Sequence, residues 1–436
     1  MNNYPSYLQA IERTDPIKVE GKVTRAVGSV IESLGPTASI GEICHLYSQD
    51  GERSIRAEVV GFKDNKILLM PIEEIQGIRT GTTTIATGQP LIIKVGEKLL
   101  GRVVNGLGEP IDGKGPLWAR EERPIYTAPT SPLKRRRIKE PLSVGIRAID
   151  GLLTCGKGQR LGIFAGSGVG KSLLLGRMAK YSQADVNVIA LIGERGREVQ
   201  DFLEKSLGEK GLKKSVVVAV TSDQPALLRV KGAFIATTIA EYFRDQGLDV
   251  LLMMDSLTRF AMAQREIGIA IGEPPATKAY PPSVYSILPR LLERTGSFSK
   301  GTITAFYTVL VEADDINEPI SDAVRSILDG HIVLSRNLAS KNHYPAIDIL
   351  RSVSRLMIDV VTPEHRRAAH KLREVLSIYE EAEDLINIGA YVKGSNPQID
   401  YALTMIDKVN NYLRQDLDEY TSYSEAVEWL IKLFEK

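Results

Sequence analysis

The sequence is poor in features that mark several classes of protein. It has only two cysteines among 436 residues, Cys44 and Cys155, and they lack metal-ligand spacing, which argues against a disulfide framework or a zinc site. No apolar run approaches the roughly 18 residues of a membrane-spanning helix, and the N-terminus has no basic segment followed by an apolar one. We therefore expect a cytoplasmic protein, peripheral at the inner face of the membrane only through a membrane-bound machine.

An excess of charge of one sign is also missing. Lys and Arg number 55 against 54 Asp and Glu, so the net charge of +1 gives no overall attraction to nucleic acid or anionic lipid. The densest basic run, Lys134 to Arg137, is interpreted as a solvated face of a linker. Residues 18–95 contain few aromatics for base stacking, Tyr47 and Phe62, so we expect no nucleic-acid partner.

The length of 436 residues suggests two or three domains, and changes of pattern divide the chain into an N-terminal segment and three domains. Residues 1–17 form a short amphipathic N-terminal segment, and residues 18–95 hold short β-rich runs between turn signals, typical of a small β-barrel. Residues 96–366 open with a Gly- and Pro-rich connection and continue with apolar strands alternating with helical stretches, which predicts an α/β domain with a parallel sheet. Residues 367–436 have helical periodicity and predict an α-helical domain.

The stretch FAGSGVGKS follows one of these apolar strands and opens a predicted helix. It matches the phosphate-binding pattern G-x-x-x-x-G-K-[ST] except for Ala at the first position. Backbone N–H groups of such a loop and the positive end of the helix dipole bind phosphates, while the lysine reaches the β and γ phosphates and the serine hydroxyl coordinates Mg²⁺. The residues predicted to bind ATP here are Ala165, Gly166, Ser167, Gly168, Val169, Gly170, Lys171, Ser172 and Leu173.

Two further strands end in carboxylates. Asp255 follows DVLLMM and is a candidate for the metal site, although a helix-capping residue would look the same. Glu194 follows NVIALIG and is the first candidate to orient or deprotonate the attacking water, with Glu198 as the second. Carboxyl ends of strands in open α/β sheets are where ligands bind, which favours Glu194 over a solvated charge run.

A positive group for the charge on the transferred phosphoryl group is expected as well. The segment HYPAIDILRSVSR offers Arg351 and Arg355, and the residues alone do not decide between them. Tyr344 in the same segment is a candidate for stacking on the base, or for filling the core.

Several long motifs resemble one family. These motifs are GERGRE, LLMMDSLTRFAMAQRE, GEPPATKAYPPSVYSILPRLLERTG and HYPAIDILRSVSR. They resemble the hexameric ATPases related to the catalytic subunit of rotary ATP synthases, and within that group the flagellum-specific ATPases of type III protein export. The resemblance runs from about residue 18 to the C-terminus. It implies a multi-domain fold with an N-terminal small β-barrel, a central α/β RecA-like P-loop NTPase domain and a C-terminal α-helical domain.

The resemblance also implies roles for individual residues. It makes Glu194 the catalytic carboxylate, Arg355 an arginine finger given to the adjacent protomer, and Arg195 and Arg259 positive groups near the phosphates. Tyr344 resembles an adenine-stacking residue, and Tyr391 flanks the base from the C-terminal domain. A homohexamer follows, since one chain would carry both the phosphate loop and the finger.

The function so implied is ATP hydrolysis, dependent on Mg²⁺, coupled to flagellar protein export. The implied partners are a stator-like regulatory protein at Tyr4 to Ile11, export chaperones and substrates, a central stalk protein and the membrane export gate. The ATPase of a virulence secretion system and the rotary synthase subunit are the alternatives within the family. An RNA translocase is the alternative from another class, because a small barrel before an ATPase domain suits that function too. A non-catalytic ring subunit would be expected to lose Glu194 or Lys171, and both are present.

Overall fold

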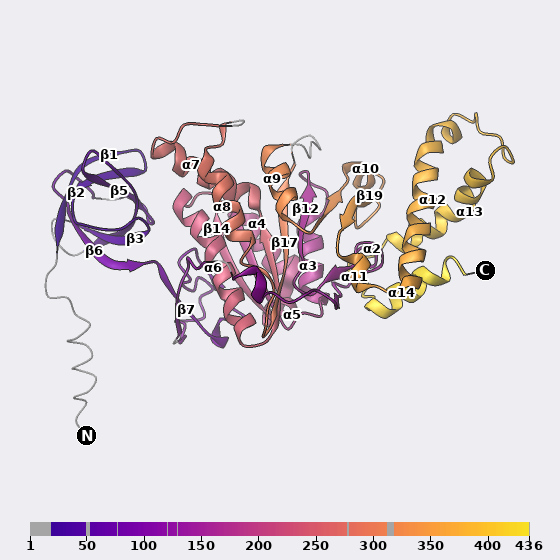
Figure 1. Ribbon diagram of the computed structural model, residues 1–436, viewed down its shortest axis with the longest axis horizontal. Helices are drawn as coiled ribbons and strands as arrows, with labels where there is room; N and C mark the ends of the chain where they lie inside the picture. The colour runs from indigo at the N-terminus through magenta and orange to yellow at the C-terminus, as the bar shows by residue number, and fades with distance from the viewer. Residues whose placement is uncertain are drawn as a thin grey trace, which may run out of the picture.

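The computed structural model describes residues 19–48, 53–75, 77–119, 121–128, 130–276, 279–311 and 318–435. The predicted N-terminal segment with its binding site at Tyr4 to Ile11 lies outside these residues. Along the described chain a barrel, a central sheet domain and a helical domain follow one another from one end of the molecule to the other (Figure 1). This arrangement confirms the predicted fold class. No helix in these ranges combines the length and apolarity needed to cross a bilayer.

The barrel closes in the strand order β1-β2-β5-β4-β3-β6. Alternating residues such as Val23, Ile31 and Leu46 point inward and make a small core of their own, as the two-residue period of a strand requires. Its strands are β1 (Glu20–Val27), β2 (Val30–Leu34), β3 (Glu42–Tyr47), β4 (Ser54–Lys63), β5 (Lys66–Pro71) and β6 (Thr83–Pro90). The next strand, β7 (Ile92–Val95), pairs with β9 (Glu121–Pro124) and stays outside the barrel. The domain boundaries given above stay a prediction.

Buried contacts join the barrel to the central domain. Lys231 on helix α6 (Ala226–Asp245) is completely buried and forms an ion pair with Glu58 of β4. Its ammonium also donates to the Tyr126 hydroxyl at 2.7 Å. Because each charge has a partner, the pair can be buried where the barrel, the linker and α6 meet.

The central sheet has the order β19-β18-β12-β17-β15-β13-β14-β8, with β16 (Gly296–Ser297) attached to β17. The Gly-rich connection after Gly101 supplies the edge strand β8 (Val103–Val104). The strands that carry the site are β12 (Arg160–Ala165), β13 (Val186–Glu194), β14 (Ser215–Thr221), β15 (Asp249–Asp255) and β17 (Thr302–Leu310). All five are parallel, so their carboxyl ends meet at one edge, as expected. Two strands not anticipated, β18 (Gly330–Leu334) and β19 (Ile347–Ser354), run antiparallel to each other.

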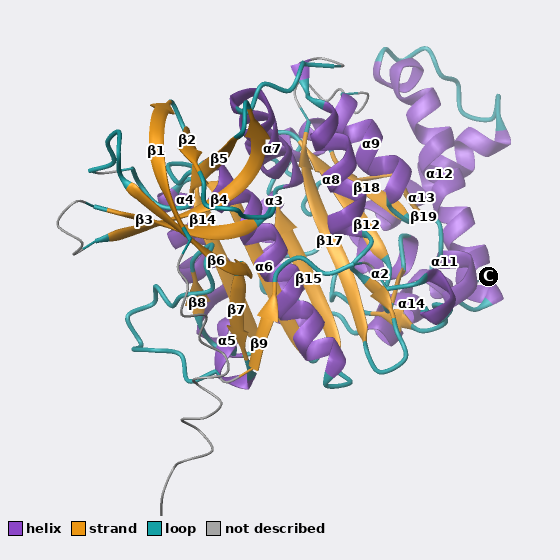
Figure 2. Cartoon of the chain, turned by 60° about the vertical axis from the view of Figure 1, so that its left-hand side comes forward, coloured by secondary structure: helices purple, strands orange, loops and turns teal. Residues whose placement is uncertain are grey.

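Helices cover both faces of this sheet (Figure 2). On β13, Val188 and Ile192 join the core under α6, while Ile189 and Leu191 join the core on the other face. The first face carries α6, α7 (Leu257–Ala270), α8 (Pro282–Leu292) and α9 (Pro319–Ile327). The second carries α2 (Arg147–Leu152), α3 (Lys171–Tyr181) and the helical domain, which consists of α12 (Pro363–Asn387), α13 (Pro397–Leu413) and α14 (Tyr423–Lys432). Short elements complete the chain: α4 (Gly196–Asp201), α5 (Gly208–Lys213), α10 (Arg336–Ser340), α11 (Met357–Val360), β10 (Pro141–Leu142) and β11 (Cys155–Gly156).

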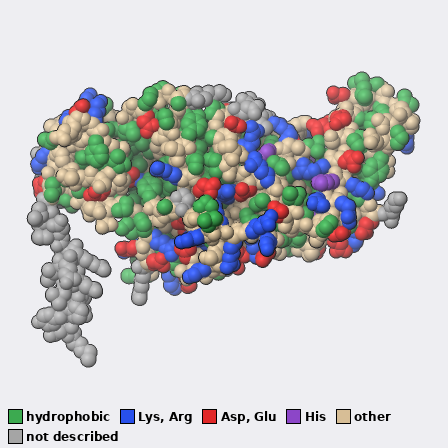
Figure 3. Space-filling model, in the orientation of Figure 1, with side chains coloured by type: hydrophobic (Ala, Val, Ile, Leu, Met, Phe, Trp, Pro, Cys, Tyr) green, Lys and Arg blue, Asp and Glu red, His purple; other side chains and the backbone are tan. Residues whose placement is uncertain are grey.

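Both cysteines are fully buried, Cys44 inside the barrel and Cys155 in the second core. Burial raises the pKa of Cys44 to about 12, and it raises that of Cys155 well above its ordinary value. On the surface shown in Figure 3, Lys and Arg side chains gather mainly over the central domain.

Candidate active site

The glycine loop lies between β12 and α3, as the sequence predicts. Gly168 has φ of 79° and Gly170 has φ of 87°, a left-handed conformation that favours glycine. A Cβ atom at Gly170 would also lie 3.4 Å from the Tyr344 ring. Helix α3 begins directly after the loop at Lys171, so its N-terminal dipole adds to the field of the loop amides. The local sequence thus builds a cradle for phosphate groups.

A pocket of about 810 Å³ opens in front of this loop. It brings together parts of the chain that are far apart in sequence, namely the loop, the end of β13, the first turns of α7 and the start of α9. Apart from Val169, the predicted loop residues line it, and so do Glu194, Glu198, Arg195 and Arg259. The volume falls within the range of ligand pockets in proteins.

Glu194 enters this pocket through an irregularity of its strand. Gly193 has φ of 72°, and the pairing of β13 with β14 shifts between Ile192 and Glu194, as in a β-bulge. A bulge turns the next side chain to a new direction, which here is the pocket. A Cβ atom at Gly193 would lie 2.9 Å from Cβ of Arg259, so glycine also allows α7 to approach.

The environment of Glu194 favours its neutral form. Burial, followed by the negative charge of Asp255, raises its pKa to about 7, although Lys171 acts in the opposite direction. Its Oε1 atom is buried without a hydrogen-bond partner in the described residues and lies 3.9 Å from Lys171 Nζ. A carboxylate with a pKa near neutrality is suited to take up a proton during turnover.

Asp255 lies behind the lysine. Its Oδ1 atom accepts hydrogen bonds from Lys171 Nζ at 2.5 Å and from Thr308 Oγ1 at 2.7 Å. Ser172 follows Lys171 in the first turn of α3 and lines the pocket. Together, Ser172 and Asp255 offer a hydroxyl and a carboxylate oxygen near a phosphate cradle. This donor set fits Mg²⁺, which binds through one or two protein oxygens together with substrate phosphates.

Positive groups surround the mouth of the pocket. Arg259 Nε is buried without a hydrogen-bond partner in the described ranges, whereas Arg195 is exposed and pairs with Glu198 at 3.3 Å. The sequence reasoning missed Arg265 and Arg336, which also line the pocket. Arg336 comes two residues after the end of β18, so it lies at the carboxyl end of a strand, as Glu194 does. Recognition of β18 in the sequence would have made Arg336 a candidate.

Tyr344 lies on the other side of the phosphate loop. It lines a second pocket of about 280 Å³ together with Val169, Leu173 and Leu417, the last from the segment between α13 and α14. The position is suited to a base whose phosphates occupy the first pocket. Tyr391, in contrast, lines neither pocket. Its hydroxyl lies 2.9 Å from Asp400 Oδ1 in the first turn of α13 and 3.0 Å from the carbonyl oxygen of Asn396 directly before that helix.

Arg351 lies in β19, and Arg355 is the residue that directly follows this strand. Both side chains are exposed, and neither lines the pocket that holds Glu194. The structure therefore does not bring Arg355 to the phosphate loop of its own chain.

Fold and site together define a P-loop ATPase with a leading β-barrel and a trailing helical domain. Residues 145–354 match the nucleotide-binding domain of the ATP synthase alpha/beta family, and residues 23–88 match its beta-barrel domain. Residues 361–432 match the C-terminal domain of the type III secretion ATPase EscN. The chain belongs to the ATP synthase alpha/beta family, within the group of flagellum-specific and type III secretion ATPases.

Individual relatives agree along nearly the whole chain. The flagellum-specific ATP synthase of Bacillus subtilis is 56% identical, over 98% of this chain and 98% of the relative. The type 3 secretion system ATPase of Xanthomonas euvesicatoria is 52% identical, over 94% and 93%. The assembled EscN in complex with its central stalk EscO, from enteropathogenic E. coli, superposes with a TM-score of 0.88 at 48% identity, over 95% of this chain and 99% of that one.

Proposed function

We propose that this chain is the ATPase of a flagellar type III export apparatus and works as a homohexameric ring. The similarity to a flagellum-specific enzyme at 56% identity supports the flagellar assignment. The ATPase of a virulence secretion system is the second candidate, because the relative from Xanthomonas is nearly as similar.

Within the site, the geometry supports a division of labour. Lys171 and the loop amides bind the phosphates, and Glu194 orients the attacking water and takes its proton. Ser172 and Asp255 would hold Mg²⁺, which supplies positive charge to the phosphates when bound. Arg259 and Arg195 add positive charge at the mouth of the pocket.

Tyr344 would stack on the adenine. The position of Tyr391 within one chain does not support its contact with the base.

The observation that carries the ring proposal is that Arg355 is exposed and does not line the pocket of its own chain that holds Glu194. An exposed arginine that does not line its own pocket can complete the pocket of a neighbour, and identical chains can close a ring by such head-to-tail contacts. The reported complex of EscN with its stalk supports a central stalk protein as a partner here. A regulatory stator protein, export chaperones with their substrates and the membrane export gate complete the proposed partners. The enzyme would be cytoplasmic and reach the membrane through this machine.

ATP hydrolysis by mixed variants tests the shared site. Arg355→Ala should lower kcat at least about 100-fold, since an arginine finger is worth roughly 10³ to 10⁵. Glu194→Gln should do the same, since a general base contributes roughly 10² to 10⁴. An equal mixture should regain activity, because some sites then combine an intact pocket with an intact finger. Arg351→Ala, in the strand that directly precedes Arg355, is the matched control and should retain wild-type turnover. An inactive mixture of folded variants, or full activity of Arg355→Ala, would overturn the proposal.

A further inference from the structure

The basic run Lys134 to Arg137 does not form a uniformly solvated face, contrary to the interpretation from sequence. Lys134, Arg136 and Arg137 are exposed, but the Arg135 side chain is only 19% exposed. Its guanidinium donates to Thr295 O at 3.0 Å and lies 3.0 Å from Glu293 Oε2. The linker is thereby attached to the turn after α8.

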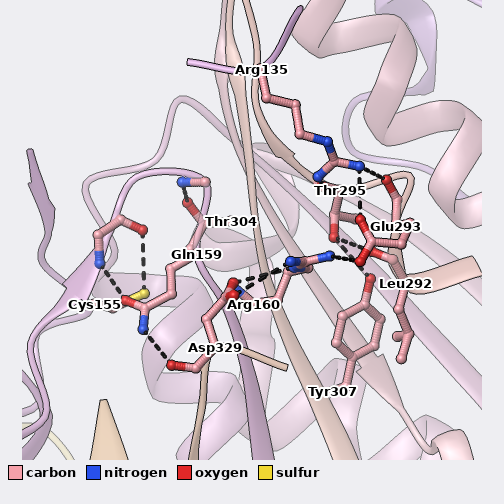
Figure 4. Close-up of polar contacts among 12 residues, drawn as sticks. Arg135, Cys155, Gln159, Arg160, Leu292, Glu293, Thr295, Thr304, Tyr307 and Asp329 are labelled. Atoms are coloured by element: carbon pink, nitrogen blue, oxygen red, sulfur yellow. Dashed lines mark hydrogen bonds and ion pairs between the residues drawn. The ribbon is translucent and has the colours of Figure 1, made fainter. Parts of the chain in front are cut away.

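Glu293 continues the contact into the sheet. Its other oxygen, Oε1, lies 2.7 Å from Arg160 NH1, and Arg160 is the first residue of β12. The backbone N–H and Nε of Arg160 both donate to Asp329 Oδ2, at 3.0 and 3.2 Å. Four side chains of alternating charge therefore run without a gap from the linker to the turn between α9 and β18 (Figure 4). We call Arg135, Glu293, Arg160 and Asp329 the linker–finger chain.

Asp329, the last residue of the linker–finger chain, binds the backbone of Arg355. The carbonyl oxygen of Asp329 accepts the backbone N–H of Arg355 at 3.0 Å and the Gln159 side-chain amide at 3.3 Å. The same amide of Gln159 donates to Ser354 Oγ at 3.0 Å. The peptide that carries Arg355 is thus fixed to the turn whose carboxylate binds Arg160.

We infer that the linker–finger chain positions Arg355 for the neighbouring subunit and makes its placement depend on the linker between β9 and β10. The inference rests on the proposed function, since it needs Arg355 to act in trans. Arg160 and Asp329 have side chains 14% and 25% exposed, so the loss of one charge leaves its partner poorly solvated and the turn free to shift. A displacement of about 1 Å at a catalytic group can cost about 100-fold in rate.

The test measures ATP hydrolysis by Asp329→Asn, Glu293→Gln and Arg135→Gln. Each should lower kcat, about tenfold or more for Asp329→Asn and severalfold for Arg135→Gln, with KM for ATP little changed. Glu140→Gln is the matched control. It removes an exposed carboxylate that lies 3.2 Å from Lys157 at the same end of the sheet but does not belong to the linker–finger chain. It should keep wild-type kcat.

Mixed rings separate a positioning role from general damage. A subunit with a displaced finger but an intact pocket should regain activity when mixed with Glu194→Gln, which supplies a good finger. It should not regain activity with Arg355→Ala. The reverse pattern, or equal recovery with both, would place the defect in the pocket and overturn the inference. If Asp329→Asn does not fold, Glu293→Gln, at a side chain 39% exposed, carries the same test.

The reference mixture of Glu194→Gln with Arg355→Ala distinguishes a failure of the shared active site from a failure of the positioning role. If that mixture stays inactive, the shared site itself is wrong, and the inference fails with the proposed function. If it recovers while the linker–finger variants show wild-type kcat, only the inference fails.

Discussion

The pH dependence of turnover gives a direct test of Glu194 as the group that receives the proton. Its pKa is raised from 4.5 to about 7, chiefly by burial and then by the charge of Asp255. At 1.36 kcal/mol per pH unit this shift corresponds to about 3 kcal/mol in favour of the neutral acid. A general base must be ionised to act, so kcat/KM should fall as the pH drops through about 7, approaching tenfold per unit below it.

The assay follows kcat/KM from about pH 5.5 to 8.5 with Mg²⁺ in excess, because kcat/KM reports groups of the free enzyme. Glu198→Gln is the informative partner variant. A hydrogen bond with Glu198 contributes to the raised pKa of Glu194, so its removal should move the midpoint to lower pH while turnover persists. A profile without a midpoint between about pH 6 and 8 would refute the assignment. So would loss of turnover in Glu198→Gln but not in Glu194→Gln.

Three further outcomes follow from packing and site geometry. Gly193→Ala should lower kcat roughly 10- to 100-fold in an enzyme with wild-type circular dichroism, since the new methyl group meets Arg259 and misdirects the strand end. Lys231→Met should cost about 3–5 kcal/mol by leaving Glu58 buried and unpaired, and Lys231→Met with Glu58→Leu should recover most of it in calorimetry. Tyr344→Ala should raise KM for ATP about tenfold with little change in kcat, whereas Tyr344→Phe should stay near wild type.

The parts of the site that the sequence predicts are those set by local rules. Lys171 and Ser172 stand in a contiguous motif, and Glu194 and Asp255 each follow an apolar run at the end of a strand. Because parallel strands end at a common edge, the strand pattern alone is enough to place two distant carboxylates near one phosphate loop.

The parts that it misses depend on long-range contacts or on broken patterns. Strand β19 alternates buried and exposed residues at the sheet edge, so it lacks the apolar run that marked the five parallel strands of the site. The position of Arg135 depends on Glu293, which lies 158 residues further along the chain. No local pattern in the basic run predicts this contact. The bulge at Gly193 likewise becomes visible only from the register of β13 against β14.

The burial of both cysteines has a practical consequence for following the ring at work. Maleimide dyes react with accessible thiolates, and Cys44 and Cys155 are fully enclosed and have raised pKa values. A cysteine introduced at an exposed position would thus be the only site to take a dye in the folded enzyme, with no need to remove the native ones. Donor- and acceptor-labelled subunits could then report the composition of mixed rings by energy transfer while their ATP turnover is measured.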